Sequence, residues 1–99
     1  MTLPIAIIGD PVVIHRLALR GDGIEVSAVR EVDGAFSHHC EVCTEAEATM
    51  WSVYIHIDGE GVDCVADWQT YLQAHAHAAE LLAAYPNLAH HGIYNGSHP

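Results

Sequence analysis

Residues 51–85 decide the fold, and they read WSVYIHIDGEGVDCVADWQTYLQAHAHAAELLAAY. Apolar and polar side chains alternate through residues 51–57, which is the period of a half-buried β-strand. A turn rich in glycine and acidic residues follows at 58–61, and the alternation then resumes through 62–66. The pattern predicts an antiparallel hairpin. The side chains expected on its buried face are Trp51, Val53, Ile55 and Cys64.

An amphipathic helix is expected directly after this hairpin. Asp67 stands where an N-cap carboxylate would accept a backbone N–H, and Tyr85 precedes a proline, which disfavours helical geometry. Packing this helix on the hairpin would stabilise both elements, because an isolated two-stranded hairpin is only marginally stable in water. Apolar residues recur at steps of three and four. The predicted buried stripe consists of Trp68, Tyr71, Leu72, His75, Ala76, Ala79, Leu82 and Ala83.

Residues 12–20 carry conflicting signals. Asp10 and Pro11 are typical of the start of a helix, whereas the β-branched residues at 12–14 favour a strand. The turn-forming residues at 20–23 and the alternation that follows them favour the strand. We therefore expect a β-hairpin with arms near 12–20 and 24–32.

Two weaker elements follow this hairpin. A strand is expected at 36–42. A single helical turn is expected at 44–49, because Thr44 and Glu47 have the spacing of a capping box.

Together these patterns predict an α+β fold, in which an antiparallel β-sheet of hairpins packs against one long amphipathic C-terminal helix. Residues 1–99 suffice for a single domain. Its expected parts are a β-rich half at 3–43, a ββα unit at 50–85 and a C-terminal tail at 92–99 with at most a short edge strand. No lysine and few prolines protect the strand edges, which would permit homodimerisation.

The segment from about 51 to 85 resembles a module of small uncharacterised bacterial proteins that are often encoded on plasmids and integrative elements. The likeness rests on Trp51–His56, on Gly61–Trp68 and on the alanine-rich helix that follows. It implies a ββα unit and a mobile-genetic-element setting. The module has no metal-binding or catalytic motif, so the resemblance assigns no functional residue.

The charge of the chain is strongly one-sided. Three arginines and no lysine face thirteen carboxylates, which gives a formal net charge of −10. Such a chain repels nucleic-acid phosphates and anionic lipids, so direct binding to nucleic acid or membrane is disfavoured. Binding to a basic protein surface is favoured instead.

Our leading hypothesis is therefore a non-catalytic interaction protein, a mobile-element accessory or inhibitor that docks on a basic, for example nucleic-acid-binding, protein. An ordinary solvated acidic surface is the alternative interpretation. The residues predicted for the docking face are Glu25, Glu31, Asp58, Glu60 and Asp63.

The most specific local motif is Ser-His-His-Cys-Glu-Val-Cys at 37–43. Cys40 and Cys43, with His38 or His39, could supply thiolates and an imidazole to tetrahedral zinc. The fourth ligand would come from elsewhere in the chain, and the candidates are His15, His90 and His91. A zinc-binding domain is thus the alternative function. If residues 36–42 form a strand, however, the two cysteines point to opposite faces and cannot chelate from it.

Motifs of common enzymes are absent, including the phosphate loop, the dinucleotide-binding glycines and the nucleophile elbow, so we expect no catalytic activity. A third hypothesis is a small-ligand pocket between helix and sheet, near Trp51, Tyr54, Trp68 and Tyr71. Three cysteines without a secretory signal point to reduced thiols and a cytoplasmic location. No apolar run approaches the roughly 18 residues of a membrane helix, so a soluble protein is expected.

Overall fold

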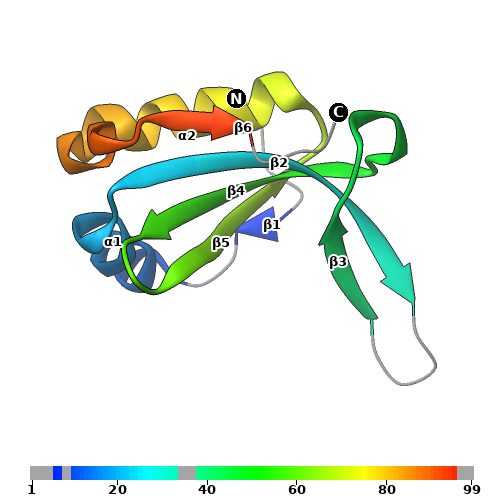
Figure 1. Ribbon diagram of the computed structural model, residues 1–99, viewed down its shortest axis with the longest axis horizontal. Helices are drawn as coiled ribbons and strands as arrows, with labels where there is room; N and C mark the ends of the chain where they lie inside the picture. The colour runs from blue at the N-terminus through cyan, green and yellow to red at the C-terminus, as the bar shows by residue number, and fades with distance from the viewer. Residues whose placement is uncertain (1–5, 8–9, 34–37, 96–99) are drawn as a thin grey trace.

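A mainly antiparallel β-sheet forms the centre of the computed structural model (Figure 1). The structure describes the backbone of residues 6–7, 10–33 and 38–95 and the side chains of residues 10–30 and 42–93. The strands are β1 (Ala6–Ile7), β2 (Gly23–Asp33), β3 (His38–Val42), β4 (Met50–Ile57), β5 (Gly61–Trp68) and β6 (Ile93–Asn95). Their order is β1-β5-β4-β2-β3, and β6 pairs with β2 in parallel.

Two α-helices and two 3₁₀ turns complete the fold. The helices are α1 (Pro11–Arg20) and α2 (Tyr71–Ala84), and the turns are η1 (Glu45–Glu47) and η2 (Pro86–His90). The predicted α+β class is confirmed, and so are the weaker predictions of a strand near 36–42 and a helical turn within 44–49. The tail forms the short strand β6, which is the most that its sequence is expected to support. Helix α2 has 14 residues, so it is shorter than the long helix expected.

The predicted hairpin of β4 and β5 is confirmed. Trp51 lies opposite Trp68 and Val53 opposite Ala66 in its antiparallel register. Gly59 lies in the connecting turn and Gly61 begins β5, and their φ angles of +78° and +93° lie in the region that glycine adopts most readily. The turn residues and the alternation of the strands therefore both favour a hairpin in this part of the chain.

A β-bulge in β5 changes which side chains share a face of the hairpin. The register shifts between Val53 and Tyr54, so that Ala66 lies opposite Val53 while Cys64 lies opposite Tyr54, and Val65 is left between them. Such an extra residue interrupts the alternation of side chains. The prediction that Cys64 lies on the buried face with Val53 is wrong for this reason.

The prediction of a hairpin arm at residues 12–20 is also wrong, because this segment is helix α1. The Asp10 side chain caps the helix by accepting the Val13 N–H at 2.9 Å, and Pro11 occupies the first helical position. The helix buries Ala18. A β-branched residue lowers helix propensity by only tenths of a kcal/mol, roughly, so the cap and the buried face outweigh it.

Helix α2 starts later than the sequence indicates. Its N-cap is Thr70, whose hydroxyl accepts the Gln73 N–H while the Gln73 side chain accepts the Thr70 N–H, both at 3.2 Å. This capping box satisfies two backbone donors reciprocally. Asp67, the predicted cap, and Trp68 belong instead to strand β5.

The predicted buried stripe of α2 is consequently wrong. The helix buries Ala74, Ala78 and Leu81, whereas the side chain of Leu72 is 77% exposed. The other predicted stripe residues that are exposed are Tyr71, His75, Ala76, Ala79 and Ala83. Because small residues face the sheet, α2 can approach β2, β4 and β5 closely.

One hydrophobic core joins both halves of the chain. Helix α1 contributes Ala18, α2 contributes its buried face, η2 contributes Leu88, and the sheet contributes Ile24, Val26, Val53, Ile55, Ile57, Val65, Ala66 and Trp68. The residues of the predicted ligand pocket are divided between two faces. Trp51 packs edge-on against Tyr71 on the helix side, at 5.2 Å between ring centroids, whereas Tyr54 alternates to the other side of β4.

A tryptophan–histidine hydrogen bond also ties α2 to the sheet. The indole N–H of Trp68 donates to Nδ1 of His77 at 3.1 Å. Burial lowers the pKa of His77 below its ordinary value of 6.5, and the nearby Glu80 opposes this only in part. The folded protein therefore favours neutral His77, and protonation at Nδ1 would remove the acceptor that Trp68 uses.

Acidification should therefore destabilise the fold through His77. The unfolded chain takes up this proton at a higher pH than the folded chain does. The stabilisation that neutral His77 gives the fold is therefore complete above pH 6.5, and it is lost as the pH falls towards the pKa of His77 in the folded protein. Replacing His77 with glutamine retains an acceptor for Trp68 without the titration. We expect H77Q to lose less free energy of unfolding than the wild type between about pH 7.5 and 5.5, measured by urea denaturation. The matched control is H75Q at an exposed site on the same helix, and equal losses in H77Q and the wild type would contradict the assignment.

Candidate functional site

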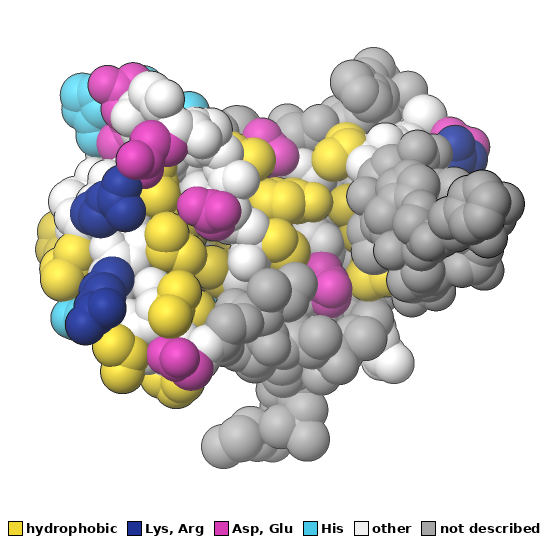
Figure 2. Space-filling model, turned by 90° about the horizontal axis from the view of Figure 1, so that it is seen from below, with side chains coloured by type: hydrophobic (Ala, Val, Ile, Leu, Met, Phe, Trp, Pro, Cys, Tyr) yellow, Lys and Arg dark blue, Asp and Glu magenta, His cyan; other side chains and the backbone are white. Residues whose placement is uncertain are grey.

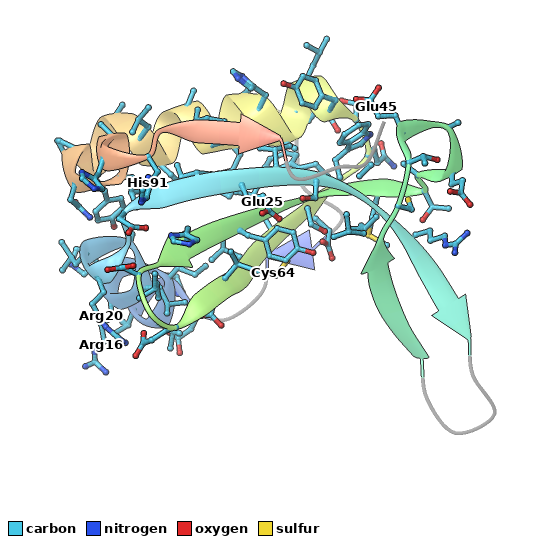
Figure 3. All side chains as sticks on the ribbon, in the orientation of Figure 1. Arg16, Arg20, Glu25, Glu45, Cys64 and His91 are labelled. Atoms are coloured by element: carbon cyan, nitrogen blue, oxygen red, sulfur yellow. The ribbon has the colours of Figure 1, made fainter. Side chains whose placement is uncertain are left out.

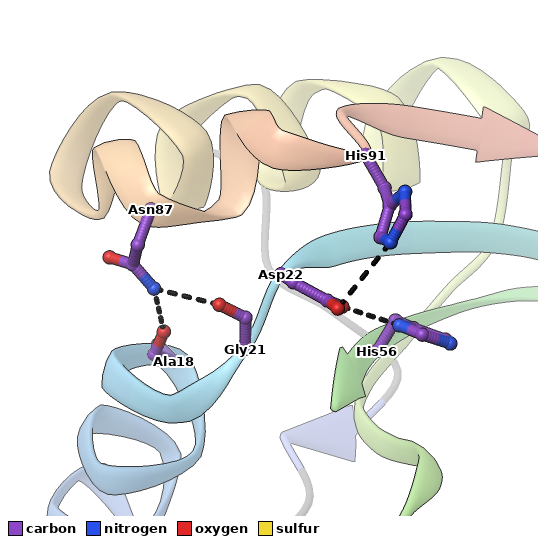
Figure 4. Close-up of polar contacts among 6 residues, drawn as sticks. All are labelled: Ala18, Gly21, Asp22, His56, Asn87 and His91. Carbon is purple, nitrogen blue, oxygen red and sulfur yellow. Dashed lines mark hydrogen bonds and ion pairs between the residues drawn. The ribbon is translucent and has the colours of Figure 1, made fainter. Parts of the chain in front are cut away.

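Three potential metal-ligating residues converge at one end of the sheet (Figure 4). Asp22 precedes β2, His56 lies near the end of β4, and His91 follows η2. Oδ1 of Asp22 is 2.5 Å from Nδ1 of His56, and Oδ2 of Asp22 is 3.4 Å from Nε2 of His91. One ligand atom from each residue lies within 4.8 Å of the other two. We refer to these residues as the Asp22–His56–His91 cluster.

Backbone hydrogen bonds hold the three segments of this cluster together. The Asp22 N–H donates to the carbonyl of His56 at 2.9 Å, and the His91 N–H donates to the carbonyl of Asp22 at 2.7 Å. Each residue is thus linked through its backbone as well as its side chain. The arrangement is set by sheet and loop geometry and does not depend on the side-chain contacts alone.

The residue before Asp22 is fixed by close packing. A Cβ atom on Gly21 would lie 2.6 Å from side-chain atoms of both Ile55 and Leu88, so only glycine fits without movement of the core. The Asn87 side chain donates to the carbonyls of Ala18 at 2.7 Å and Gly21 at 2.9 Å (Figure 4). Asn87 thereby satisfies carbonyls at the C-terminus of α1 and positions the chain that leads into Asp22.

The histidines favour the ionised form of Asp22. The hydrogen bond from His56 is the main cause that holds the pKa of Asp22 below its ordinary value; desolvation opposes it, and the charges of His56, His91 and His90 assist it. The side chains of Asp22, His56 and His91 are 17%, 29% and 50% exposed. The cluster is therefore a carboxylate with two imidazoles that solvent can reach.

No local motif in the sequence indicates this cluster. Asp22 and His56 are 34 positions apart, and no spacing rule connects them. From the sequence, His91 is a candidate only as a distant ligand for a cysteine site, and His56 falls at a polar position of the alternation in residues 51–57. The three meet because β2 pairs with β4 while the loop after η2 returns the chain to β2.

A second polar group lies on the helix-free face of the sheet (Figure 3). Cross-strand pairing places Glu25, Tyr54 and Cys64 in one row and Ser27, Ser52 and Asp67 in the next. The Ser27 hydroxyl donates to Glu25 at 2.8 Å, and the Ser52 hydroxyl donates to Asp67 at 2.5 Å. Both serines are buried, so these hydrogen bonds satisfy groups that water does not reach.

The thiol and the phenol in this polar group are poor nucleophiles. Burial, assisted by the charge of Asp67, raises the pKa of Cys64 to about 12. Burial and the neighbouring Cys64 raise the pKa of Tyr54 to about 12. Both groups are protonated at neutral pH, and thiol chemistry requires the thiolate. The arrangement favours a structural hydrogen-bond network over catalysis.

The residues predicted for docking occupy different places. Asp58, Glu60 and Asp63 are exposed at the end of the β4–β5 hairpin. Glu60 pairs with Arg20 at the end of α1. Glu25 is half-buried on the helix-free face, and the side chain of Glu31 lies outside the described residues.

The predicted cysteine zinc site cannot be assembled from the described side chains. Cys43 is buried directly after β3, where its N–H continues the sheet by donating to the carbonyl of Ala28 at 3.0 Å. The side chains of His38, His39 and Cys40 lie outside the described residues, so this site stays a prediction. Within the described part of the chain, the Asp22–His56–His91 cluster is the group of three ligating residues that the fold brings together.

Comparison with known proteins adds no assignment: no family model matches the chain, and no match was found among curated proteins or solved structures. Among the described residues, no helix combines the length and apolar character needed to cross a membrane.

Proposed function

We propose that this chain is a non-catalytic acidic interaction protein that docks on a basic protein, such as one that binds nucleic acid. The observation that supports this proposal is the exposed acidic hairpin tip, which consists of Asp58, Glu60 and Asp63. A projecting group of carboxylates can attract and orient a cationic surface, and attraction of this kind mainly accelerates association.

Among the described residues, positive charge offsets one of the three carboxylates of the acidic hairpin tip and leaves the other two unpaired. Arg20 pairs with Glu60, and Arg30 pairs with Glu47 at 2.6 Å. Neither Asp58 nor Asp63 has an ion pair within the described part of the chain. With a net charge of −10, the molecule presents an excess of negative charge, and these two carboxylates are free to contact a partner.

Exposed apolar side chains of β5 and α1 would supply the centre of an interface, and the Arg20–Glu60 pair joins the end of α1 to the acidic hairpin tip. Val62 is 42% exposed between the acidic residues, while Val12 and Leu19 of α1 are 58% and 57% exposed. Figure 2 shows hydrophobic side chains gathered around the two arginines of α1 on this side of the molecule. Protein interfaces commonly combine an apolar centre with a charged rim, as this surface would.

The resemblance of residues 51–85 implies a mobile-genetic-element setting for this docking function. A mobile-element accessory or inhibitor would use its carboxylates in place of nucleic-acid phosphates and occupy a basic groove. This part rests on the resemblance of residues 51–85 and on the charge of the chain.

Charge reversal at the acidic hairpin tip tests the proposal. The double variant D58K/D63K leaves the Arg20–Glu60 pair intact, whereas E45K/E80K makes the same charge change at exposed carboxylates elsewhere. A partner captured from extracts of the source cells is immobilised, and association rates are measured at several salt concentrations. We expect D58K/D63K to slow association at least about tenfold and to flatten its salt dependence, since steering accelerates association by roughly 10–1,000-fold.

The control variant E45K/E80K distinguishes attraction at the acidic hairpin tip from an effect of the total charge of the chain. If D58K/D63K and E45K/E80K slow association equally, the hairpin tip is not the docking surface. If association of the wild type is independent of salt, the proposal of a basic partner fails as a whole.

A further inference from the structure

We propose that the Asp22–His56–His91 cluster is a zinc site, with Nδ1 of His56, Nε2 of His91 and the Asp22 carboxylate as its protein ligands. This inference concerns a different part of the molecule from the acidic hairpin tip and does not depend on docking. It also differs from the cysteine site predicted from residues 38–43, because it uses no thiolate.

One contact of the cluster already has the spacing of neighbouring ligands around tetrahedral zinc. Zn–N and Zn–O distances near 2.0–2.2 Å place neighbouring ligand atoms about 3.3–3.5 Å apart. The 3.4 Å between Nε2 of His91 and Oδ2 of Asp22 already matches this spacing. The 2.5 Å between Nδ1 of His56 and Oδ1 of Asp22 must lengthen by roughly 1 Å, which a small rotation of either side chain would achieve.

The chemistry of the ligands favours zinc over magnesium or calcium. Imidazole nitrogens suit zinc and related transition metals, whereas magnesium and calcium prefer all-oxygen coordination. Three protein ligands leave a fourth position for water or for a donor from another molecule. His91 is half-exposed, so water can reach the cluster and fill this position.

The fold holds the three proposed ligands in place without a metal ion. The backbone hydrogen bonds that link Asp22 to His56 and to His91 hold the three ligands together before an ion arrives. Gly21 and Asn87 fix the segment that carries Asp22. A cation is also attracted by a chain whose net charge is −10.

Cobalt and zinc titrations test the site. Protein stripped with a chelator is titrated with Co²⁺ and with Zn²⁺, and binding is followed by visible absorbance and by calorimetry. We expect one ion per chain with a tetrahedral Co²⁺ spectrum that lacks a thiolate charge-transfer band. H91Q should weaken zinc binding at least about tenfold, since losing even a supporting group of a metal site commonly costs 10–100-fold.

Matched variants make each outcome decisive. H75Q removes an exposed histidine outside the cluster and should bind zinc as the wild type does, and so should C40S, which removes a thiol that the cysteine site would need and leaves the buried Cys43 unchanged. H91Q changes a half-exposed side chain, so it should fold, and its melting temperature without metal verifies this. Zinc binding that survives H91Q, that is lost in C40S or that shows a thiolate band would overturn the proposal, as would the absence of stoichiometric zinc binding.

Discussion

Replacing Leu88 with alanine is expected to lower the free energy of unfolding by about 2–5 kcal/mol, whereas Leu72→Ala should change it by less than about 0.5 kcal/mol. Leu88 is fully buried, and Leu72 is 77% exposed. The two substitutions delete the same atoms, so the difference between them reports burial. Urea denaturation followed by tryptophan fluorescence measures both free energies.

The environment of Leu88 explains the size of the expected loss. Leu88 projects from η2 into the core beside Ile55 and Gly21. A cavity at this point could not be filled easily, because the neighbours belong to different elements of the fold. The Leu88 carbonyl also accepts the N–H of Gly92, which follows His91 directly. Similar losses for the two variants would show that η2 does not anchor the loop that carries His91.

The sequence predicted the elements that depend on local patterns. The hairpin of β4 and β5 follows from the alternation through residues 51–57 and from a turn that contains Gly59 and ends at Gly61. Both signals lie within about 20 residues, and each supports the other. The α+β class follows from the same segment, because a hairpin with one apolar face requires a helix or a second sheet to cover it.

The incorrect predictions arose where contacts distant in sequence decide between local alternatives. Residues 12–20 could form either element from propensity alone, and burial of Ala18 against the sheet favours the helix. The bulge at Val65 could not be anticipated, because alternation is a local rule that takes no account of register against β4. The Asp22–His56–His91 cluster is the extreme case, since its members meet only after three separate segments have paired.

The start of α2 shows how one boundary error rotates a whole helix face. A helix that starts at Asp67 has Trp68 as the first member of its buried stripe and Ala76 and Ala79 as core residues. The pairing of Trp68 with Trp51 extends β5 instead, and the helix then begins after its Thr70 cap. The face that meets the sheet is therefore set by the strand register, which local spacing does not contain.

Substituting leucine for alanine on α2 distinguishes these two faces directly. Ala78→Leu should destabilise the protein by about 1–3 kcal/mol, because Ala78 is fully buried against the sheet and added methylene groups must displace their neighbours. Ala79→Leu should change the free energy of unfolding by less than about 0.5 kcal/mol, since Ala79 is exposed. Thermal and urea denaturation of the two variants measure the difference.

The two positions form a closely matched pair. They are neighbours in the same helix, and alanine and leucine are both good helix formers, so intrinsic helix propensity contributes little to the comparison. Successive residues of an α-helix are rotated by about 100°, so only one of the two can face the sheet. The stripe predicted from the sequence requires Ala79→Leu to be the more damaging substitution, and the structure requires Ala78→Leu. A larger loss for Ala79→Leu would therefore show that α2 is rotated on the sheet, and the Trp68–His77 hydrogen bond would not form in that orientation.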